Sequence, residues 1–364
     1  CTAVPLDTNL TEENLILFLN HSDAVAIITS GNFVDKISGI RNKVIKLKRI
    51  ISFDGAGHSV TSFSDIINDK VQFDIVKIPK LGDVASLIYT SGTSGHPKAV
   101  MLTHSNFLYE LAAGSKRVDV TSADSFIVLL PLYHIFAFTT IFLFSCSVGS
   151  TLTFVRSLKK NEILDTIKET NTTIVFGVPK IFESIYNGVI DRLSEQPSNK
   201  KFIVKTFTLA NNASIRLFKK NFGKILFNDI HKQIGSSIRL MVSGGAAISK
   251  DVLVGMSLLG FPITEGYGMT ETSPVVTINE IGTKFGSVGK ALEGIEIRIV
   301  EPSEDGIGEI AIKGPVVMEG YYKNKELTKR TIRDCWLYTK DLGFIEKDGC
   351  LYIKGRKDNV IILP

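Results

Sequence analysis

A short segment rich in hydroxyl groups and glycine, residues 90–98 (TSGTSGHPK), carries the side chains best suited to binding phosphate. Its glycines allow successive backbone N–H groups to point toward one centre, a nest that suits phosphate oxygens. Further donors are the hydroxyl groups of Thr90, Ser91, Thr93 and Ser94. Lys98 adds a positive charge but follows Pro97, so this is not a Walker A loop, which needs Gly-Lys-Ser/Thr. The segment alone is consistent with a phosphate loop and with a flexible connection.

A second segment, PITEGYGMTETSP at residues 262–274, sets the carboxylate of Glu271 beside the hydroxyl of Thr270. A carboxylate next to phosphate donors is what a Mg²⁺ ion bridging a nucleotide requires. Tyr267 lies between two glycines and is suited to stacking on a base. A glycine-rich turn with a helix-capping Thr-Glu pair explains the same residues without a ligand.

A third segment, residues 337–362, places Asp341 in an expected turn after one strand and Arg356 after another. An acidic residue at a strand end binds ribose hydroxyls in other nucleotide sites. A turn aspartate and a surface arginine are the alternatives that involve no nucleotide.

The elements around these segments predict an α/β fold. Short apolar runs alternate with amphipathic stretches, which indicates βαβ units and a largely parallel sheet. The expected strands are residues 24–29, 43–53, 125–131, 150–155, 173–179 and 238–245, with helices at 134–146 and 161–170. After residue 285 apolar and polar residues alternate between Gly, Pro and Asp turns, which predicts antiparallel hairpins. Residues 191–235 are Lys-rich and predict helices on the outside of the core.

Bulk composition indicates a folded protein, with 44% hydrophobic and 22% charged residues. The net charge of +5 comes with no long basic block, which argues against a nucleic-acid partner. Four cysteines without a CxxC pair favour free thiols in a reducing compartment. No signal peptide is visible, and both ends resemble cuts in a longer protein.

Residues 126–155 contain one clearly ionisable side chain, His134, over a length that could cross a bilayer. Pro131, Gly149 and several hydroxyl residues interrupt this run. The pattern favours a buried strand–helix–strand over a transmembrane helix.

In the order and spacing of these motifs, YTSGTSGHPKAVMLTH, GYGMTETSP and TKDLGF…IKGRKDNVI, the chain resembles the adenylate-forming superfamily of acyl-CoA synthetases, luciferases and adenylation domains. The N-terminal run AVPLDTNLTEENLILFLNHSDAVAII also resembles an early segment of that family. The resemblance implies two stacked βαβ-type subdomains with mostly parallel sheets, plus a small antiparallel, barrel-like subdomain. It divides the chain into 1–284 (with the phosphate loop 90–98 and a helical insert at about 191–235), 285–355, and a hinge beginning at 356–364. A C-terminal domain, with the lysine used for adenylation and the surface admitting the thiol, is expected to be absent.

The resemblance also assigns roles to single residues. The loop that holds the β- and γ-phosphates of ATP comprises Thr90, Ser91, Gly92, Thr93, Ser94, Gly95 and Lys98. Thr270 contacts the α-phosphate, and Glu271 with Thr93 holds Mg²⁺. The adenine lies between Tyr267–Gly268 and the opposite wall, Gly244, Gly245 and Ala246. Asp341 and Arg356 hold the ribose, His134 lies near the acyl carboxylate, and Asp358 is the hinge.

The sequence departs from the family pattern at three positions. Lys340 and Cys335 stand where the family usually has glycine, and Ala99 replaces a frequent glycine after the loop lysine. All three are expected to be turn positions, so the departures concern local geometry rather than the reaction.

The run VFGVPKIFESIYNGVIDRL and the helical insert resemble long-chain fatty acyl-CoA synthetases most. The implied reaction is ATP- and Mg²⁺-dependent formation of acyl-AMP with release of pyrophosphate, followed by transfer to coenzyme A. It requires no protein nucleophile, in line with the lack of a GxSxG elbow. The alternatives are transfer to an acyl-carrier-protein thiol and a catalytically inactive nucleotide-binding scaffold. A cytoplasmic location is expected, and peripheral attachment to the inner face of a membrane stays open.

Overall fold

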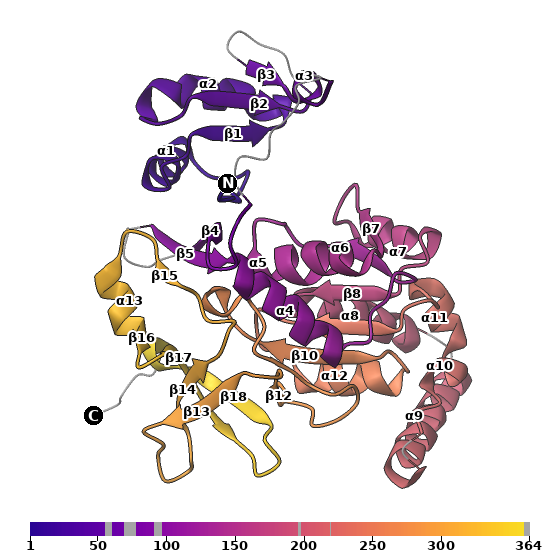
Figure 1. Ribbon diagram of the computed structural model, residues 1–364. Coiled ribbons are helices and arrows are strands. Elements are labelled where there is room, and N and C mark those ends of the chain that lie inside the picture. The colour runs from indigo at the N-terminus through magenta and orange to yellow at the C-terminus, as the bar shows by residue number, and fades with distance from the viewer. Residues whose placement is uncertain (55–59, 69–77, 91–96, 196–197, 219, 360–364) are drawn as a thin grey trace. The chain divides into compact units, whose positions relative to one another are not determined.

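The computed structural model describes residues 1–54, 60–68, 78–90, 97–195, 198–218 and 220–359 (Figure 1). The chain divides into two compact units, one of residues 1–104 and 319–325, the other of residues 105–318 and 326–364. The expected boundary at residue 284 follows a change in sequence pattern and stays a prediction.

The first unit contains a parallel sheet, β1-β2-β3, and an antiparallel sheet, β15-β5-β4. Its strands are β1 (Ala26–Thr29), β2 (Arg49–Ser52), β3 (Val60–Ser62), β4 (Val84–Thr90), β5 (Lys98–Thr103) and β15 (Gly320–Tyr321). Its helices are α1 (Glu12–His21), α2 (Val34–Ile40), α3 (Phe63–Asn68) and the 3₁₀ turns η1 (Gly31–Phe33) and η2 (Arg41–Lys43). Thr11 begins α1 by accepting a hydrogen bond from the Asn14 N–H, as an N-cap should.

The segment from residue 90 to residue 98 connects β4 to β5, since Thr90 pairs with Lys98 and Tyr89 with Ala99. Ala99 is fully buried within β5, so the expectation of a turn at this position is wrong. The strand pairing starts at Lys98 itself, which leaves Ala99 inside the ladder.

In the second unit, seven strands among the described residues form a sheet in the order β12-β11-β10-β9-β8-β6-β7. The five strands from β10 to β7 are parallel, and β11 and β12 add antiparallel pairs at one edge. The sheet comprises β6 (Ser125–Val128), β7 (Thr151–Phe154), β8 (Ile174–Gly177), β9 (Leu240–Ser243), β10 (Ile263–Tyr267), β11 (Thr277–Ile278) and β12 (Lys290–Ala291). This arrangement confirms the α/β class expected from the alternating pattern.

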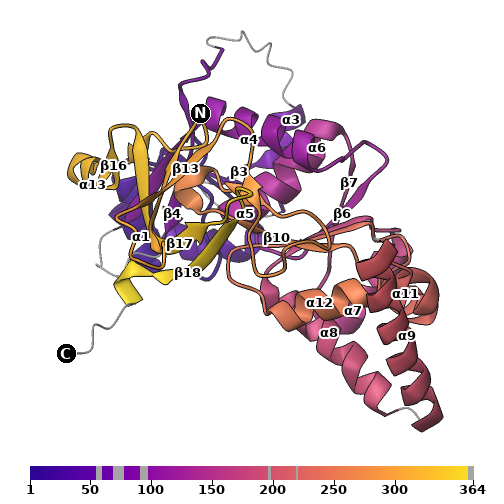
Figure 2. The ribbon, with the colours of Figure 1, turned by 90° about the horizontal axis from the view of Figure 1, so that it is seen from below.

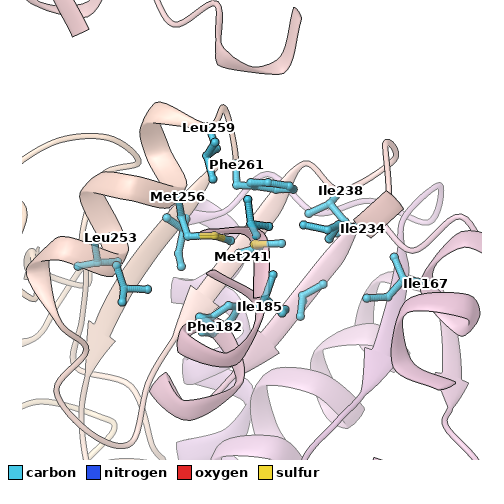
Figure 3. Close-up of a cluster of buried hydrophobic side chains, with 14 of the residues drawn as sticks. Ile167, Phe182, Ile185, Ile234, Ile238, Met241, Leu253, Met256, Leu259 and Phe261 are labelled. Atoms are coloured by element: carbon cyan, nitrogen blue, oxygen red, sulfur yellow. The ribbon is translucent and has the colours of Figure 1, made fainter. Parts of the chain in front are cut away.

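Helices cover both faces of this sheet because successive strand side chains point to opposite sides. Ile127, Val175 and Met241 face a cluster built with α7 (Lys160–Glu169), α8 (Pro179–Ser194), α11 (Asn228–Ile234) and α12 (Lys250–Leu258) (Figure 3). Phe126, Phe176 and Val242 face a second cluster built with residues of α4 (His104–Arg117), α5 (Ile135–Ala137), the π-helix η3 (Phe138–Leu143) and α6 (Phe144–Val148). The near-continuous apolar strands therefore form the centre of a three-layer unit.

The apolar run 126–155 forms β6, the α5–η3–α6 helix and β7, which confirms the predicted strand–helix–strand order; β6 is fully buried, whereas β7 at the edge of the sheet is partly exposed. Gly149 ends α6 in the left-handed conformation, with φ of 72°. Among the described residues, no helix combines the length and the apolar character needed to span a bilayer.

The predicted antiparallel strands after residue 285 are also present. They form a sheet in the order β13-β14-β17-β16, with β18 paired to β17. Its strands are β13 (Glu296–Val300), β14 (Gly308–Lys313), β16 (Ile332–Arg333), β17 (Trp336–Ile345) and β18 (Leu351–Arg356), flanked by α13 (Lys325–Thr331) and the 3₁₀ turn η5 (Lys357–Asn359). The pairing of β14 with β17 shifts between Glu309 and Ala311, which makes a bulge at residues 339–341 of β17.

The Lys-rich segment 191–235 is helical, as predicted. It contains the end of α8, then α9 (Ser198–Phe218), α10 (Gly223–Leu226) and α11. Helices α8 and α9 lie side by side and extend away from the parallel sheet (Figure 2).

Two departures from the family pattern coincide with left-handed backbone. Cys335 has φ of 64° and Lys340 has φ of 63°, a region that glycine occupies without steric cost. Asp334, with φ of 49°, and Cys335 form the two-residue turn between the pairs Arg333–Trp336 and Ile332–Leu337, the geometry of a type I′ hairpin.

We expect Cys335→Gly to stabilise the protein by about 0.5–1 kcal/mol, because glycine relieves the left-handed strain but costs some unfolded-chain entropy. Urea denaturation measures the change in the free energy of unfolding. Cys335→Ala is the matched control, since it removes the thiol but keeps the Cβ atom. Equal stabilisation by both variants would contradict the conformational explanation.

Candidate nucleotide site

The parallel strands of the second unit bring several predicted site segments to one edge of the sheet. Ser243 of β9 pairs with Gly177 of β8 and with Glu265 of β10, so β8 and β9 end side by side and β10 continues for two residues to Tyr267. The residues that follow the carboxyl ends are His134 after β6, Gly244–Ala246 after β9 and Gly268–Thr270 after β10. This edge is where open α/β sheets bind ligands.

Gly244 lies where the loop after β9 meets the helix after β6. A Cβ atom on Gly244 would lie 2.8 Å from the ring of Phe136, and the Gly244 N–H donates to the Gly177 carbonyl at 3.1 Å. Gly245 is exposed with φ of 81°. The backbone of residues 244–246 is therefore fixed close to α5, whose N-cap is the exposed His134.

The segment Gly268–Pro274 is tightly folded. A Cβ atom on Gly268 would lie 1.8 Å from the Pro274 carbonyl oxygen, so only glycine fits. The Thr272 hydroxyl accepts from the Met269 N–H at 3.0 Å and starts the 3₁₀ turn η4 (Thr270–Thr272). Glu271 is 8% exposed, and its carbonyl accepts from the Met318 N–H at 2.9 Å. Thr270 and Glu271 are thus held by backbone contacts rather than by a flexible turn.

Helix α4 braces this segment with two side chains that the sequence reasoning missed. Asn106 donates to the carbonyls of Pro315 at 2.7 Å and Val317 at 3.0 Å. Both residues belong to the segment 315–318, which ends at Met318, the donor to the Glu271 carbonyl. Glu110 is buried and accepts a hydrogen bond from the Val275 backbone, while burial raises its pKa well above the usual value. The sequence does carry a signal for Glu110, because it is an acidic residue within the largely apolar run FLYELAA. A carboxyl that is buried with such a run needs a hydrogen-bond partner.

Asp341 contacts two other predicted nucleotide residues, Tyr267 and Arg356. Its Oδ2 accepts from the Tyr267 hydroxyl at 2.7 Å, and its Oδ1 lies 3.0 Å from Nε of Arg356. Burial raises the pKa of Asp341, an effect that the Tyr267 hydrogen bond and the Arg356 charge oppose. Burial also raises the pKa of Tyr267 well above its usual value. The cluster places the Asp341 carboxyl group beside the ring of Tyr267, a pair of groups suited to binding the ribose and the base of a nucleoside.

The expectation that Asp341 lies in a turn after a strand is wrong. Asp341 lies inside β17, directly after Lys340 in the bulge, and pairs with Arg356 at the end of β18. A bulge changes the direction of a side chain without ending the strand. The turn-like residues of the sequence at this position therefore correspond to the bulge inside β17.

The predicted hinge residue Asp358 lies next to this cluster in the chain. Lys340 Nζ lies 3.0 Å from Oδ2 of Asp358, and Lys357 Nζ lies 3.1 Å from Oε2 of Glu309. Both members of the Lys340–Asp358 pair are largely exposed, so the pair contributes little stability.

The predicted phosphate-loop residues belong to the other unit. Thr90 and Lys98 are paired across β4 and β5, while Ser91, Gly92, Thr93, Ser94 and Gly95 lie outside the described residues. The predicted site residues therefore divide between the two units, with Thr90 and Lys98 in the first and the Asp341 cluster in the second.

Tyr89, immediately before the loop, belongs to a polar network that sequence reasoning also missed. Its ring stacks on Phe18 at 4.1 Å, and its hydroxyl donates to the Phe18 carbonyl and lies 2.9 Å from Nδ1 of His21. Asp23 accepts from Tyr322 and pairs with Lys323 at 2.7 Å. The end of β4 is therefore anchored to the end of α1.

Mg²⁺ is the metal implied for this site. Among the described residues, no three His, Cys, Asp or Glu side chains cluster as a protein metal cage would require. A single buried carboxylate, Glu271, beside the Thr270 hydroxyl fits Mg²⁺, which commonly takes one or two carboxylates and completes its shell with phosphate oxygens and water.

Comparison with known proteins identifies one family. A model of the AMP-binding enzyme family matches residues 1–322. The chain is 30% identical to long chain acyl-CoA synthetase 6, peroxisomal, of Arabidopsis thaliana, over 99% of the chain and 55% of that protein. It is 27% identical to the chloroplastic long-chain-fatty-acid–[acyl-carrier-protein] ligase AEE15 of the same plant, over 96% of the chain and 58% of that protein. The chain thus spans little more than half of these relatives.

The fold is also found among solved structures. The anthranilate CoA ligase AuaEII, solved with anthranoyl-AMP, superposes with a TM-score of 0.80 at 23% identity, over 100% of this chain and 64% of that one. This similarity confirms the predicted fold.

Glu265, in the middle of β10 and two residues before Tyr267, gives a pH prediction. Burial raises its pKa from 4.5 to about 7, partly opposed by the hydrogen bond from the Gly286 N–H. Because the folded state holds this proton more tightly, the stability it contributes is complete below pH 4.5 and is lost as the pH rises through about 7.

We therefore expect Glu265→Gln to remove a loss of about 2–3 kcal/mol in unfolding free energy between pH 4.5 and 8. The amide oxygen keeps the acceptor for Gly286. Urea denaturation at pH 5 and pH 8 measures the difference, and the exposed Glu304→Gln serves as control. A pH dependence that is unchanged in Glu265→Gln would show that another group causes it.

Proposed function

The chain belongs to the AMP-binding enzyme family, and on this premise we propose that the whole protein activates a long-chain fatty acid with ATP. The fatty acid carboxylate attacks the α-phosphorus, forming the C–O–P bond of acyl-AMP, and pyrophosphate leaves as the Pα–O bond to it breaks. The thiolate of coenzyme A then forms a thioester as the bond to AMP breaks. The Asp341 cluster at the carboxyl edge of the parallel sheet carries the proposal.

The described residues take distinct parts in the first step. Asp341 and Arg356 would hold the ribose, with Tyr267 against the adenine, while Thr270 would donate to the α-phosphate. Gly244, Gly245 and Ala246 would form the opposite wall, and His134 would lie near the acyl carboxylate. Their backbone is fixed by hydrogen bonds, so the donors need little reorganisation when charge moves onto the phosphate.

Lys98, with the loop that precedes it, would hold the β- and γ-phosphates and the departing pyrophosphate. Bound Mg²⁺ would supply neutralisation of phosphate charge, held by Glu271 and, in the proposed loop, Thr93. Catalysis would then consist of positioning and charge stabilisation.

The acyl acceptor has a second candidate. Similarity to synthetases named for acyl-CoA supports coenzyme A, and similarity to AEE15, named as an acyl-carrier-protein ligase, supports a carrier-protein thiol. Assays with coenzyme A and holo carrier protein side by side separate the two.

We also propose a reducing compartment and peripheral contact with a membrane. All four cysteines are free of disulfides, which supports the former. The amphiphilic nature of a long-chain fatty acid supports the latter, because such substrates concentrate in bilayers.

Glu271→Ala in the whole protein should abolish Mg²⁺-dependent pyrophosphate release, with kcat/KM lowered by about 100-fold to 1,000-fold, the usual cost of one preorganised charge or donor. Pyrophosphate release across a series of fatty acids measures this effect and the chain-length preference together. The exposed Glu304→Ala is the control. Normal turnover by Glu271→Ala would rule out the metal role.

Asp341→Asn in the 364-residue chain should weaken binding of a non-hydrolysable acyl-AMP analogue by about 10-fold to 100-fold, the loss expected for a charged hydrogen bond. Calorimetric titration measures the dissociation constant. Asp305→Asn, an exposed acid in the β13–β14 turn, is the matched control. Unchanged affinity in Asp341→Asn would place the ribose elsewhere.

A further inference from the structure

The helical insert differs in net charge from the rest of the chain. Residues 196–228 contain seven Lys and Arg and no Asp or Glu. The remainder of the chain has 35 basic and 37 acidic residues. The whole positive excess of the protein therefore resides in this one segment, although the overall net charge is small.

The same segment exposes large apolar side chains. In the C-terminal half of α9, Leu209, Ala213 and Leu217 follow the four-residue spacing of one helix face and are all exposed. Leu209 is 61% exposed and Leu217 73%. Phe222 and Ile225, at the start of α10, are 43% and 74% exposed. Lys220 and Lys224 alternate with them and are exposed as well.

A buried amide network holds this surface rigidly. Asn211, on the opposite side of α9 from the exposed stripe, accepts from the Phe222 N–H at 2.7 Å and donates to Asn221 at 2.9 Å and to the Leu258 carbonyl at 2.8 Å. Asn221 donates in turn to the Ser257 carbonyl at 2.8 Å. The turn after α9 is thereby fixed to the end of α12, and its apolar side chains stay in solvent because the backbone cannot turn them inward.

We propose that Leu209, Leu217, Lys220, Phe222, Lys224 and Ile225 form a docking surface for an anionic membrane. Exposed apolar side chains interleaved with lysines, in a range (196–228) that contains no acid, match an interface where apolar groups enter the acyl boundary and ammonium groups meet lipid phosphates. An acidic protein would use the charge but not the separate aliphatic side chains. The preference for a lipid partner rests on the proposed function, because a fatty acid substrate is delivered from a bilayer.

Sedimentation of the 364-residue chain with vesicles tests this surface. We expect binding to vesicles of phosphatidylcholine with 30% phosphatidylserine by mass ratio, and weak binding to phosphatidylcholine alone, using about 150 mM salt as the physiological reference. The double variant Lys220→Gln/Lys224→Gln should lower the partition coefficient by about 20-fold to 30-fold, since each lysine near the surface contributes about a factor of five. Leu217→Ser/Ile225→Ser should also lower binding to the anionic vesicles, and lowering the salt concentration should not restore that binding.

Matched controls separate surface from bulk charge. Lys290→Gln/Lys347→Gln removes two exposed lysines outside the insert, and Ile281→Ser removes an exposed aliphatic group. Both should bind like the parent chain. Equal losses in control and test variants, or a failure of the parent to bind anionic vesicles, would overturn the proposal. Acyl-AMP-analogue binding by the same variants reports separately on the proposed function, which can fail while vesicle binding persists.

Discussion

Parallel pairing of β6, β8, β9 and β10 is the constraint on which the site of the second unit depends. The register aligns Ser243 with both Gly177 and Glu265, so the loops after β8 and β9 leave the sheet at the same level, while β10 continues for two residues to Tyr267. The opposite edge is closed by Asp124, which binds Thr173 at 2.7 Å and Arg239 at 2.6 Å and whose pKa is lowered to about 2, mainly by Arg239. One edge is therefore fixed by an ion pair between the buried Asp124 and the partly exposed Arg239, and the other is available for ligands.

The loops at the carboxyl edge of the parallel strands are rigid because residues outside these loops form hydrogen bonds with their backbone groups. Met318 binds the carbonyl of Glu271, Ser273 donates to Val316 at 2.7 Å, and Asn106 binds the same segment, 315–318, from α4. A site that stabilises developing phosphate charge gains most from donors that are already oriented. The buried carboxyl of Glu110 also holds the segment after Glu271, since it accepts a hydrogen bond from the Val275 backbone, and burial raises its pKa well above the usual value.

Strain gathers next to the nucleotide cluster. Lys340 adopts a left-handed conformation in the bulge that turns Asp341 toward Tyr267, and its ammonium reaches Asp358. Strained backbone persists where the surrounding pairing over-determines it, here through β14 and β18 on either side of β17. The chain therefore keeps a side chain at a position that glycine would occupy more easily.

The sequence by itself determined the fold class, the order of the elements and the family. Apolar period, turn residues and the order of three motifs are local properties that need no knowledge of distant contacts. Its assignments of Asp341 and Ala99 to turns were wrong, because a bulge and a hairpin stem both carry turn-like residues while the ladder continues. Assignment of individual roles to Lys98, Thr270 and Glu271 stays a prediction.

The contact between Tyr267, Asp341 and Arg356 is visible only in the tertiary structure. The same is true of the hydrogen bonds by which Asn106 and Glu110 hold the segments next to Glu271. Tyr267 lies 74 positions before Asp341 in the sequence. Asn106 and Glu110 lie more than 150 positions before Glu271. Their proximity is set by strand register and helix packing across the whole unit. Burial, which shifts the pKa values of Glu110, Glu265 and Asp341, is likewise a property of the packed chain and of no single segment.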